Sequence, residues 1–341
     1  MATIKDVAAK AKVSVGTVSN VLRRSNSVSE QIRNRVERVI QILDYHPNQS
    51  ARSLKTSQSH LLGMVISDIT NPFFPQLARG AEDAAIQHGY LLIASNTDDQ
   101  LDREKQALSV LRSRRVDGIL LVVAPNGGDN EHLQKLVASD IPVVCLDRVP
   151  EGLSLDAVTT DAVQGAEMCI RHLLSVGHRS IAIIVGNVQL QTARDRLQGY
   201  EQALSEQGIS VDPRLVFEGD FRMESGYLLT KRMLLGKCKP TAVFVCNGMM
   251  ALGAFRAIKE LGLRCPEDIA VAVFDEVPGN GSFTPEITCV VQQAYQMGYQ
   301  GVKLLLSRME AGGNQTARQI LLPAELRIAE STRPARGSSV D

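Results

Sequence analysis

Apolar side chains in the first 45 residues recur at helical spacing. Residues 4–11 and residues 36–43 each place them at positions i, i+3, i+4 and i+7, on one face of a helix. Between these segments, residues 14–22 read Ser-Val-Gly-Thr-Val-Ser-Asn-Val-Leu, and Ser14 follows a short break where it can cap the next turn. The pattern predicts three short helices, the first two joined by the tight corner of a helix-turn-helix.

From residue 61 onward, short continuous apolar runs alternate with longer amphipathic stretches. The predicted strands are residues 61–66, 90–94, 119–123, 141–146, 181–185, 242–246 and 269–274. The predicted helices include residues 78–88, 106–114, 163–176, 196–207 and 251–261, and Gly89, Gly177, Gly208 and Gly262 follow four of them as left-handed stops. The alternation indicates parallel sheets covered by helices on both faces, and the length fits two similar α/β lobes.

These patterns divide the chain into four segments. They are a helix-turn-helix head at residues 1–46, a short helix and linker at 47–60, a two-lobed body at 61–333 and a Gly/Ser-rich tail at 334–341 that we expect to be disordered. Pro47 ends the third helix, because proline disfavours helix at the residue before it. Residues 48–56 contain one large apolar side chain, Leu54, which is too little for an isolated helix. This segment therefore needs a partner to fold.

The distribution of charge separates the head from the body. The whole chain has a net charge of zero, which alone argues against a nucleic-acid-binding protein. Residues 1–60, however, contain ten Lys or Arg and four Asp or Glu, so the remaining 281 residues carry 27 basic against 33 acidic side chains. A basic head on an acidic body is typical of a protein whose head contacts nucleic acid.

The six cysteines include no Cys-x-x-Cys pair and fall mostly in apolar runs. We therefore expect buried, reduced thiols, with neither a metal site nor a disulfide framework. No run approaches the roughly 18 apolar residues of a membrane span, and the N-terminus lacks the apolar core of a signal peptide. A cytoplasmic location is the expectation.

The segments Thr3-Ile4-Lys5-Asp6-Val7-Ala8, Thr17-Val18-Ser19 and Tyr45-His46-Pro47-Asn48 form a specific signature. With the two-lobed body, they resemble the lactose repressor (LacI/GalR) family of bacterial transcription regulators, over residues 2 to about 333. The body resembles sugar-binding proteins of the ribose-binding type, to which Asn71-Pro72-Phe73-Phe74 is specific. The resemblance implies a repressor that binds double-stranded operator DNA as a homodimer and responds to a small molecule.

The predicted DNA contacts fall into two groups. Val15, Gly16 and Asn20 are candidates to read base edges in the major groove, the first two because they occupy specificity positions of the family. The residues better placed to hold phosphates are Lys5, Thr17, Ser19 and Arg33. Ser14 is the remaining predicted DNA contact in the head. The alternative for Val15, Val18 and Val21 is that they only fill the core of the head.

The resemblance gives residues 48–56 a specific role. In this family the leucine that corresponds to Leu54 is wedged into the minor groove at the operator centre, where an apolar wedge kinks the duplex. Asn48, Ala51 and Arg52 share that segment and are predicted DNA contacts. Folding of the segment would depend on DNA and a second copy of the chain. The alternative is that Leu54 packs against the body.

Polar and aromatic residues follow the predicted strands, at the edge where ligands of parallel sheets bind. The ten candidates are Asn71, Phe73, Phe74, Asp147, Arg148, Arg196, Phe221, Asn247, Asp275 and Gln292, and each matches a sugar-contacting position of the ribose-binding type. Aromatic faces cover the C–H surface of a sugar, while the polar groups bond its hydroxyls. Two carboxylates and two guanidiniums leave the cleft near neutral, so we expect a neutral monosaccharide, with an aldopentose such as ribose leading.

Several alternatives stay open at this point. A hexose, a sugar phosphate or a purine could occupy the cleft; Asp147 with Arg148 could be a structural ion pair, and Phe73 or Phe74 could be core. Many relatives have aspartate where Gly248 follows Asn247, so a helix-capping or ligand-orienting group could be lost. A sugar-acting enzyme is disfavoured because the chain has no nucleophile elbow, phosphate loop or zinc-protease motif, and we expect no cofactor. A free sugar-binding protein would have no use for a basic head.

Overall fold

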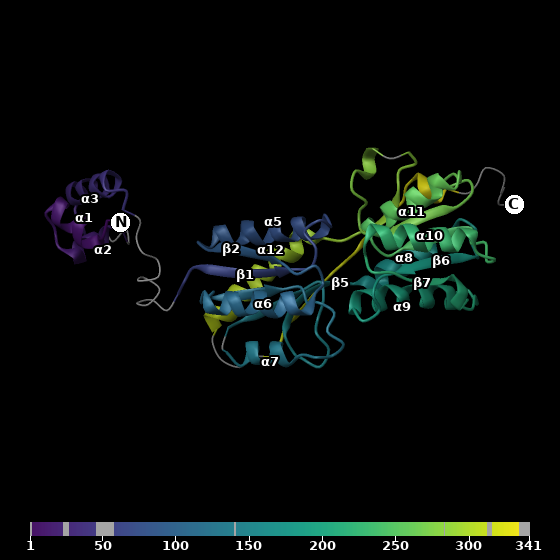
Figure 1. Ribbon diagram of the computed structural model, residues 1–341, viewed down its shortest axis with the longest axis horizontal. Coiled ribbons are helices and arrows are strands. Elements are labelled where there is room, and N and C mark those ends of the chain that lie inside the picture. Colours follow the sequence, from purple (N-terminus) through teal and green to yellow (C-terminus); the bar gives the residue numbers. More distant parts are fainter. Residues whose placement is uncertain are drawn as a thin grey trace. The chain divides into compact units, whose positions relative to one another are not determined.

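The computed structural model describes residues 2–22, 27–45, 58–139, 141–282, 284–311 and 316–333 (Figure 1). The chain divides into two compact units, residues 1–59 and residues 60–341. Residues 48–56, for which a helix was predicted, and the tail at residues 334–341 lie outside the described residues.

The first unit contains the three predicted helices, α1 (Ile4–Ala11), α2 (Val15–Leu22) and α3 (Glu30–Ile42). Thr3 and Asp6 form a capping box, in which the Thr3 N–H donates to Asp6 Oδ2 at 2.7 Å. Val7, Val18 and Val36 are fully buried at the centre, where the three helices meet. Such a small core relies on close packing of β-branched side chains.

The second unit contains two six-stranded sheets, one in each lobe. Its helices and strands run in the order β1 (Leu61–Ile66), α5 (Phe73–Gln87), β2 (Leu91–Asn96), α6 (Leu101–Ser113), β3 (Gly118–Leu121), α7 (Glu131–Val137), β4 (Val143–Leu146), β5 (Asp156–Thr160), α8 (Ala162–Ser175), β6 (Ile181–Val185), α9 (Gln191–Glu206), β7 (Val216–Glu218), α10 (Met223–Leu235), β8 (Ala242–Val245), α11 (Gly248–Glu260), β9 (Ala270–Phe274), β10 (Thr288–Val291), α12 (Ala294–Ala311), β11 (Gln319–Leu322) and β12 (Glu325–Arg327). The strand orders are β11-β5-β4-β3-β1-β2 in the first lobe and β12-β10-β9-β8-β6-β7 in the second.

Helices cover both faces of each sheet, as the strand and helix pattern predicted. In the first lobe α5 and α12 pack on one face and α6 and α7 on the other (Figure 1). Successive strand residues serve the two faces alternately: Met64 joins the cluster under α5 and α12, whereas Val65 joins the cluster under α6. In the second lobe α8 pairs with α9, and α10 pairs with α11.

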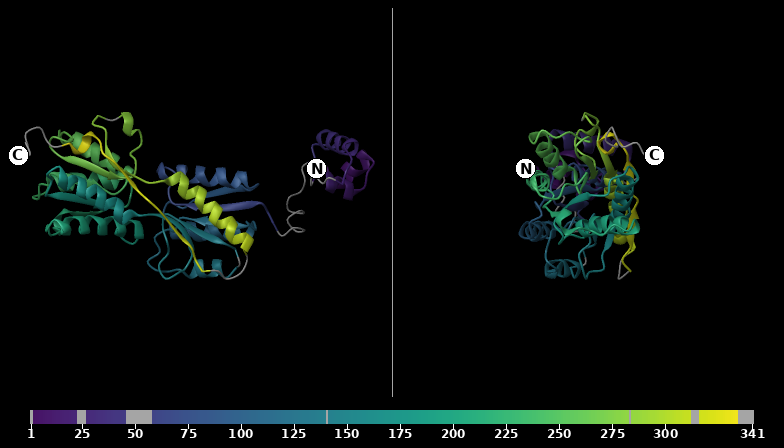
Figure 2. Two further views of the ribbon diagram at one scale, coloured as in Figure 1. Left: turned by 180° about the vertical axis from the view of Figure 1, so that it is seen from behind. Right: turned by 90° about the vertical axis from the view of Figure 1, so that its right-hand side faces the viewer.

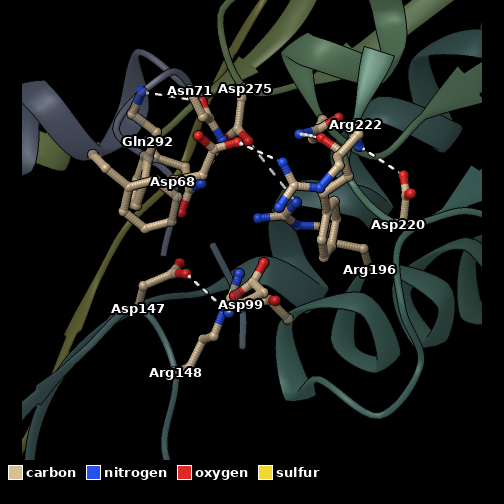
Figure 3. A pocket seen from close by; sticks show the side chains of 15 residues that line it. Asp68, Asn71, Asp99, Asp147, Arg148, Arg196, Asp220, Arg222, Asp275 and Gln292 are labelled. Atoms are coloured by element: carbon tan, nitrogen blue, oxygen red, sulfur yellow. Dashed lines mark hydrogen bonds and ion pairs between the residues drawn. The ribbon is translucent and has the colours of Figure 1, made fainter. Parts of the chain in front are cut away.

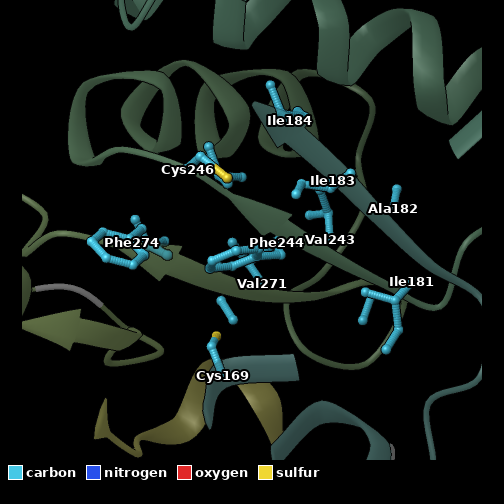
Figure 4. Packing of buried hydrophobic residues seen from close by; sticks show 14 of the residues in the cluster. Cys169, Ile181, Ala182, Ile183, Ile184, Val243, Phe244, Cys246, Val271 and Phe274 are labelled. Atoms are coloured by element: carbon cyan, nitrogen blue, oxygen red, sulfur yellow. The ribbon is translucent and has the colours of Figure 1, made fainter. Parts of the chain in front are cut away.

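The largest single cluster of buried hydrophobic side chains lies in the second lobe (Figure 4). Phe244 of β8 and Phe274 of β9 are fully buried and lie with their ring centroids 6.5 Å apart. Cys169 and Cys246 are also buried there, in agreement with the predicted burial of the thiols, whereas Cys238 and Cys265 are only half-buried. Phe274 is the last residue of β9, so this core extends to the carboxyl edge of the sheet.

Several element boundaries differ from the prediction. Helix α5 begins at Phe73 rather than at residue 78, with Pro75 in its first turn, where proline is tolerated. Helix α9 begins at Gln191 rather than at residue 196, because its polar first turn carries no apolar stripe. Strands β5, β7, β10, β11 and β12 were not predicted, since their short runs include polar residues such as Asp156 and Glu325. Strand β12 runs antiparallel to β10, an exception to the parallel sheets. The four predicted glycine stops are confirmed, with φ from 67° to 98°.

The chain passes between the lobes three times, after β5, after β10 and between β11 and β12. Figure 2 displays the last of these crossings as a long yellow segment running from one lobe to the other. Three crossings allow the lobes to change their angle while each sheet stays intact. Among the residues that the structure describes, no helix is both long enough and apolar enough to span a bilayer.

Candidate functional site

The ten side chains selected for the cleft all line one pocket between the two lobes (Figure 3). They are Asn71, Phe73, Phe74, Asp147, Arg148, Arg196, Phe221, Asn247, Asp275 and Gln292. The space between them amounts to about 450 Å³, including the part open to solvent. Their contact with a bound ligand stays a prediction.

Four pocket residues adopt the left-handed backbone conformation, which is strained for residues other than glycine. The φ angle is 59° at Asp99, 64° at Asp147, 66° at Phe221 and 78° at Asp275. Each residue lies just beyond a strand, namely β2, β4, β7 and β9. Strain of this kind gathers at ligand sites because the surrounding structure must hold side chains in fixed positions.

Arg148 connects the carboxylates of the first lobe. Its guanidinium donates to Asp99 Oδ1 at 2.6 Å and to the Val123 carbonyl at 3.1 Å, and its Nε lies 3.5 Å from Asp147 Oδ2. Only 5% of Arg148 is exposed. Asp147 and Arg148 therefore form an ion pair and also line the pocket, so a structural role and a ligand-contacting role are compatible. Burial raises the pKa of Asp147 to about 6, against the opposing effect of Arg148 and Arg196.

Arg196 is the corresponding cation of the second lobe. Its guanidinium donates to the Cys246 carbonyl, lies 3.9 Å from Asp275 Oδ2 and stacks over the Phe274 ring at 4.0 Å from the centroid. It is 4% exposed, on the second turn of α9. Phe274 is thus part of the core of the lobe, and the guanidinium that stacks on its ring lines the cleft.

Asp275 and Asn247 are fixed by neighbours at the ends of β9 and β8. Asp275 accepts a hydrogen bond from the Gln292 amide, and burial raises its pKa despite the nearby Arg196. Asn247 caps α11, since its Oδ1 accepts from the Met250 N–H at 2.7 Å. Its Nδ2 donates to the Phe221 carbonyl at 2.9 Å. Asn247 therefore holds Phe221 in its strained conformation.

The aromatic residues serve the core and the pocket together. Phe73 and Phe74 lie edge to face at 5.1 Å, belong to the core of the first lobe and also line the pocket. Asn71 Oδ1 accepts from the Phe73 N–H at 3.2 Å at the start of α5. Across the cleft, the Phe221 ring lies over Gly186, where an added Cβ would be 2.0 Å from the ring. Glycine at 186 is thus required for this ring position.

Five pocket residues were missed by sequence reasoning. They are Asp68, Asp99, Thr192, Asp220 and Arg222. Asp68 and Asp99 follow strands β1 and β2, so the rule of searching beyond strand ends could have found them. Thr192 was missed because the start of α9 was placed too late. Arg222, before α10, crosses between the lobes and donates to the Asp98 carbonyl at 3.1 Å.

The missed residues change the charge of the pocket. With them it has five carboxylates and three guanidiniums, so the expectation of a nearly neutral cleft was wrong. The count from the sequence had included only two of each. The formal excess of negative charge disfavours an anionic ligand more strongly than a neutral pocket would.

Gly248, at the position where the family resemblance implies aspartate in many relatives, does not leave α11 without a cap, because Asn247 caps it. A Cβ at position 248 would lie 2.5 Å from the Glu276 carbonyl oxygen. The main chain beyond β9 thus approaches the start of α11 too closely for a side chain. The departure at this position permits close packing of two pocket-forming loops.

In the head, α2 separates its predicted roles by face. Val18 and Val21 are buried, whereas Val15 is 42% exposed and is therefore not a core residue. Gly16, Asn20, Lys5 and Ser14 are exposed, and Thr17, Ser19 and Arg33 are half-buried. Ser14 Oγ accepts from the Thr17 N–H at 3.0 Å, which confirms the predicted cap. The DNA contacts of these residues stay predictions, and Asn48, Ala51, Arg52 and Leu54 lie outside the described residues.

Two family comparisons cover most of the chain. Residues 3–48 match "Bacterial regulatory proteins, lacI family", and residues 59–330 match "Periplasmic binding proteins and sugar binding domain of LacI family". The first match covers the head, and the second match covers the two-lobed body described above.

Individual proteins match over nearly the whole length. The HTH-type transcriptional repressor PurR of Aliivibrio salmonicida is 35% identical over 312 residues, covering 91% of this chain and 93% of that protein. The ribose operon repressor of Haemophilus influenzae is 34% identical over 332 residues, covering 97% and 98%. The solved Lac repressor dimer bound to operator and the anti-inducer ONPF has a TM-score of 0.86 against this chain, with 30% identity, covering 97% of this chain and 99% of that chain.

Proposed function

This chain belongs to the lacI family of bacterial regulatory proteins, and we propose that it binds a pseudo-palindromic operator as a homodimer under the control of a small neutral sugar. It is a DNA-binding transcriptional repressor with a small-molecule-binding body, not an enzyme. We infer a cytoplasmic location from this role, because the operator of a bacterial repressor is in the cytoplasm.

The arrangement of the cleft carries the proposal of a neutral sugar. Carboxylates, guanidiniums and amides from both lobes converge on one space that also has phenylalanine rings on its walls. Hydroxyls both donate and accept, so a polyol can bond with all three kinds of group, while its C–H faces contact the rings. The five carboxylates against three guanidiniums disfavour a sugar phosphate.

An aldopentose such as ribose is the leading candidate for the sugar. A relative that is 34% identical over 332 residues is named as a ribose operon repressor, which supports this choice. Hexoses and purines are the competing ligands. A site that bonds hydroxyls rejects an analogue lacking one by large factors, because its own buried groups would lose their partners.

Control of the operator would come from a change in the angle between the lobes. Arg222 of the second lobe bonds the Asp98 carbonyl of the first, and Arg194 bonds Glu151 across the same divide. A sugar shifts the equilibrium between open and closed lobes only by its difference in affinity for the two forms. We propose that sugar binding releases the operator, so that the sugar acts as an inducer.

The effector proposal is tested by calorimetry on the full-length protein. The panel contains ribose and other pentoses, hexoses, sugar phosphates and purines, and we expect binding of a neutral monosaccharide. Asp275→Asn should abolish that binding, whereas Asp268→Asn, outside the cleft and paired with Arg264, should leave it unchanged. Binding of only a phosphorylated sugar or a purine would contradict the proposal.

The operator half of the proposal concerns residues of the head and residues 48–56, the latter outside the described residues. Val15, Gly16 and Asn20 would read bases, Lys5, Ser14, Thr17, Ser19 and Arg33 would support phosphate contacts, and Asn48, Ala51, Arg52 and Leu54 would act at the operator centre. Leu54→Ala should reduce both affinity for a palindromic operator and its bend angle, measured by gel mobility of permuted fragments. If the variant bends DNA as strongly as the parent, Leu54 is not a wedge.

Head pairing would require the dimer, and affinity should fall steeply with salt because phosphate contacts release counterions. Sedimentation measurements with and without operator test the oligomeric state directly. A monomer that binds a single half-site as tightly as the full operator would contradict the dimeric mechanism.

A further inference from the structure

A fully buried carboxylate, that of Glu104, lies in the first lobe behind the wall of the cleft. Glu104 is in the first turn of α6, and none of its side chain is exposed. Its Oε1 lies 2.6 Å from Nε2 of His132, in the first turn of α7, and its Oε2 accepts from the Ala124 N–H at 2.6 Å. Because a carboxylate only accepts hydrogen bonds, the His132 ring donates to it. The His132 side chain is 12% exposed, so the whole pair is shielded from solvent.

Stability alone gives little reason for this pair. A buried charge is costly to desolvate, and apolar side chains of similar volume often stabilise a fold as well or better. The pair also leaves Nδ1 of His132 buried without a hydrogen-bond partner among the described residues. Buried polar groups that support a binding site, by contrast, fix the side chains that contact the ligand. We therefore looked for a cleft residue that this pair holds in place.

The pair is connected to the cleft through one peptide unit. Glu104 accepts from the N–H of Ala124, and the carbonyl of Val123, in the same peptide unit, accepts from Nη1 of Arg148 at 3.1 Å. The unit is planar and trans, so its N–H and C=O point in opposite directions, and a bond that fixes one also fixes the other. Glu104 and Arg148 thus lie on opposite sides of this peptide unit. Arg148 is the cleft cation that also bonds Asp99 at 2.6 Å.

The charge of Glu104 also acts on Arg148. Burial lowers the pKa of the Arg148 guanidinium, but the carboxylates of Asp99, Asp147 and Glu104 together raise it above its ordinary value. Hydrogen bonds in a chain inside a protein polarise one another, so the carboxylate strengthens the Val123 carbonyl as an acceptor for the guanidinium. Glu104 therefore favours both the charge and the position of Arg148.

We propose that Glu104 and His132 form a positioning pair for effector binding, which holds Arg148 through the peptide unit of Val123 and Ala124. His132 fixes the carboxylate, the carboxylate fixes the N–H, and the carbonyl of that unit holds the guanidinium at the cleft. The inference rests on the proposed function and adds to it, because two residues outside the cleft join those that set the sugar affinity.

His132→Leu tests the pair by removing the donor to Glu104. Full-length protein is titrated by calorimetry with ribose, and with glucose and galactose in parallel. The affinity for the sugar that the parent binds should fall about tenfold, because Arg148 loses its fixed acceptor. His132→Gln should restore it to within about twofold of the parent, since the glutamine amide can donate to the carboxylate. A variant that only fails to fold would instead bind fewer sugars per chain at the parent affinity.

A double substitution tests whether the pair acts through Arg148. Arg148→Lys keeps the charge and removes the planar guanidinium that bonds Asp99 and the Val123 carbonyl. Adding His132→Leu to Arg148→Lys should lower the sugar affinity by less than about a further twofold, because the two changes affect the same contact. A full further tenfold loss would show that the pair acts elsewhere, and would overturn the proposed connection.

His172→Leu is the matched control. His172 is a half-buried histidine of α8 whose Nε2 lies 2.7 Å from Thr332 Oγ1, and it does not line the cleft. The substitution removes a comparable ring and a comparable hydrogen bond from the second lobe. It should leave the sugar affinity unchanged, whatever its effect on thermal unfolding.

The outcomes separate this inference from the proposed function. If the parent binds a monosaccharide and His132→Leu binds it as tightly, or if His132→Gln does not restore the affinity, the pair has only a structural role and the proposed function stands. If the parent binds no monosaccharide, the proposed function is wrong and this inference is wrong with it.

Discussion

The cleft and the outer face of α2 are the two recognition surfaces of this protein, and they are built in opposite ways. Four charged side chains of the cleft, those of Asp147, Arg148, Arg196 and Asp275, are buried, and Arg148 is bonded to Asp99. The outer face of α2 instead presents exposed Val15, Gly16 and Asn20. Substitutions in the cleft should therefore change ligand binding and stability together, whereas those on α2 should change DNA binding alone.

Among substitutions in the cleft, the buried recognition surface, Arg196→Met should have the largest effect. The substitution removes the cation beside Asp275 and the bond to the Cys246 carbonyl. We expect a loss of about 3 kcal/mol in the free energy of unfolding, because an uncompensated buried charge remains, and a loss of about 100-fold in sugar affinity. Urea unfolding and calorimetry measure the two effects. Arg171→Met, at an exposed pair with Glu206, should change neither, and a stable Arg196→Met protein would contradict the comparison.

The pH dependence of sugar affinity tests Asp147. Its folded pKa is raised to about 6 by burial, so the folded protein gains stability from this group as pH falls through 6 and loses it as pH rises through 6. Sugar affinity should instead rise with pH, because protonation of Asp147 removes a carboxylate acceptor. We expect affinity to fall about tenfold per pH unit below 6.

Asp147→Asn should flatten that profile in calorimetry between pH 5 and pH 8. Asp212→Asn, whose carboxylate pairs with Arg214 on the surface, is the control and should keep the parent profile. An unchanged profile in Asp147→Asn would mean that another group controls the pH dependence.

Asn20→Ala tests the exposed half. Asn20 is the polar candidate on the reading face of α2, so its loss should lower discrimination between the operator and a mismatched site by about 1 kcal/mol. Lys5→Ala should instead weaken both DNAs equally and reduce the salt dependence. Fluorescence anisotropy with the two DNAs measures this, and sugar affinity should be unchanged in both variants.

Ser14→Ala separates capping from DNA contact. Ser14 Oγ accepts from the Thr17 N–H, so the substitution should lower the stability of the head by about 1 kcal/mol or less. Thermal unfolding measures the change. If operator affinity falls far more than this loss of stability allows, Ser14 contacts DNA directly.

Local patterns were sufficient for the head and for the alternation of the body, because each helix and buried strand there has its own periodicity. The ten cleft residues could also be predicted from the sequence, since ligands of parallel sheets bind at the carboxyl ends of the strands. The edge strands β7 and β12 could not be predicted, because short segments with polar residues have no distinctive hydrophobic pattern. The same limitation concealed Thr192, which belongs to the polar first turn of α9.

The sequence by itself determined the helix-turn-helix core, the two α/β lobes and the list of polar residues beyond the strands, because these depend on spacing along the chain. Only the tertiary structure decided the charge of the cleft and the link from Arg222 to Asp98. Those features depend on which loops of the two lobes meet in space. Residues such as Asp98 and Arg222 are 124 positions apart, and no local period relates them.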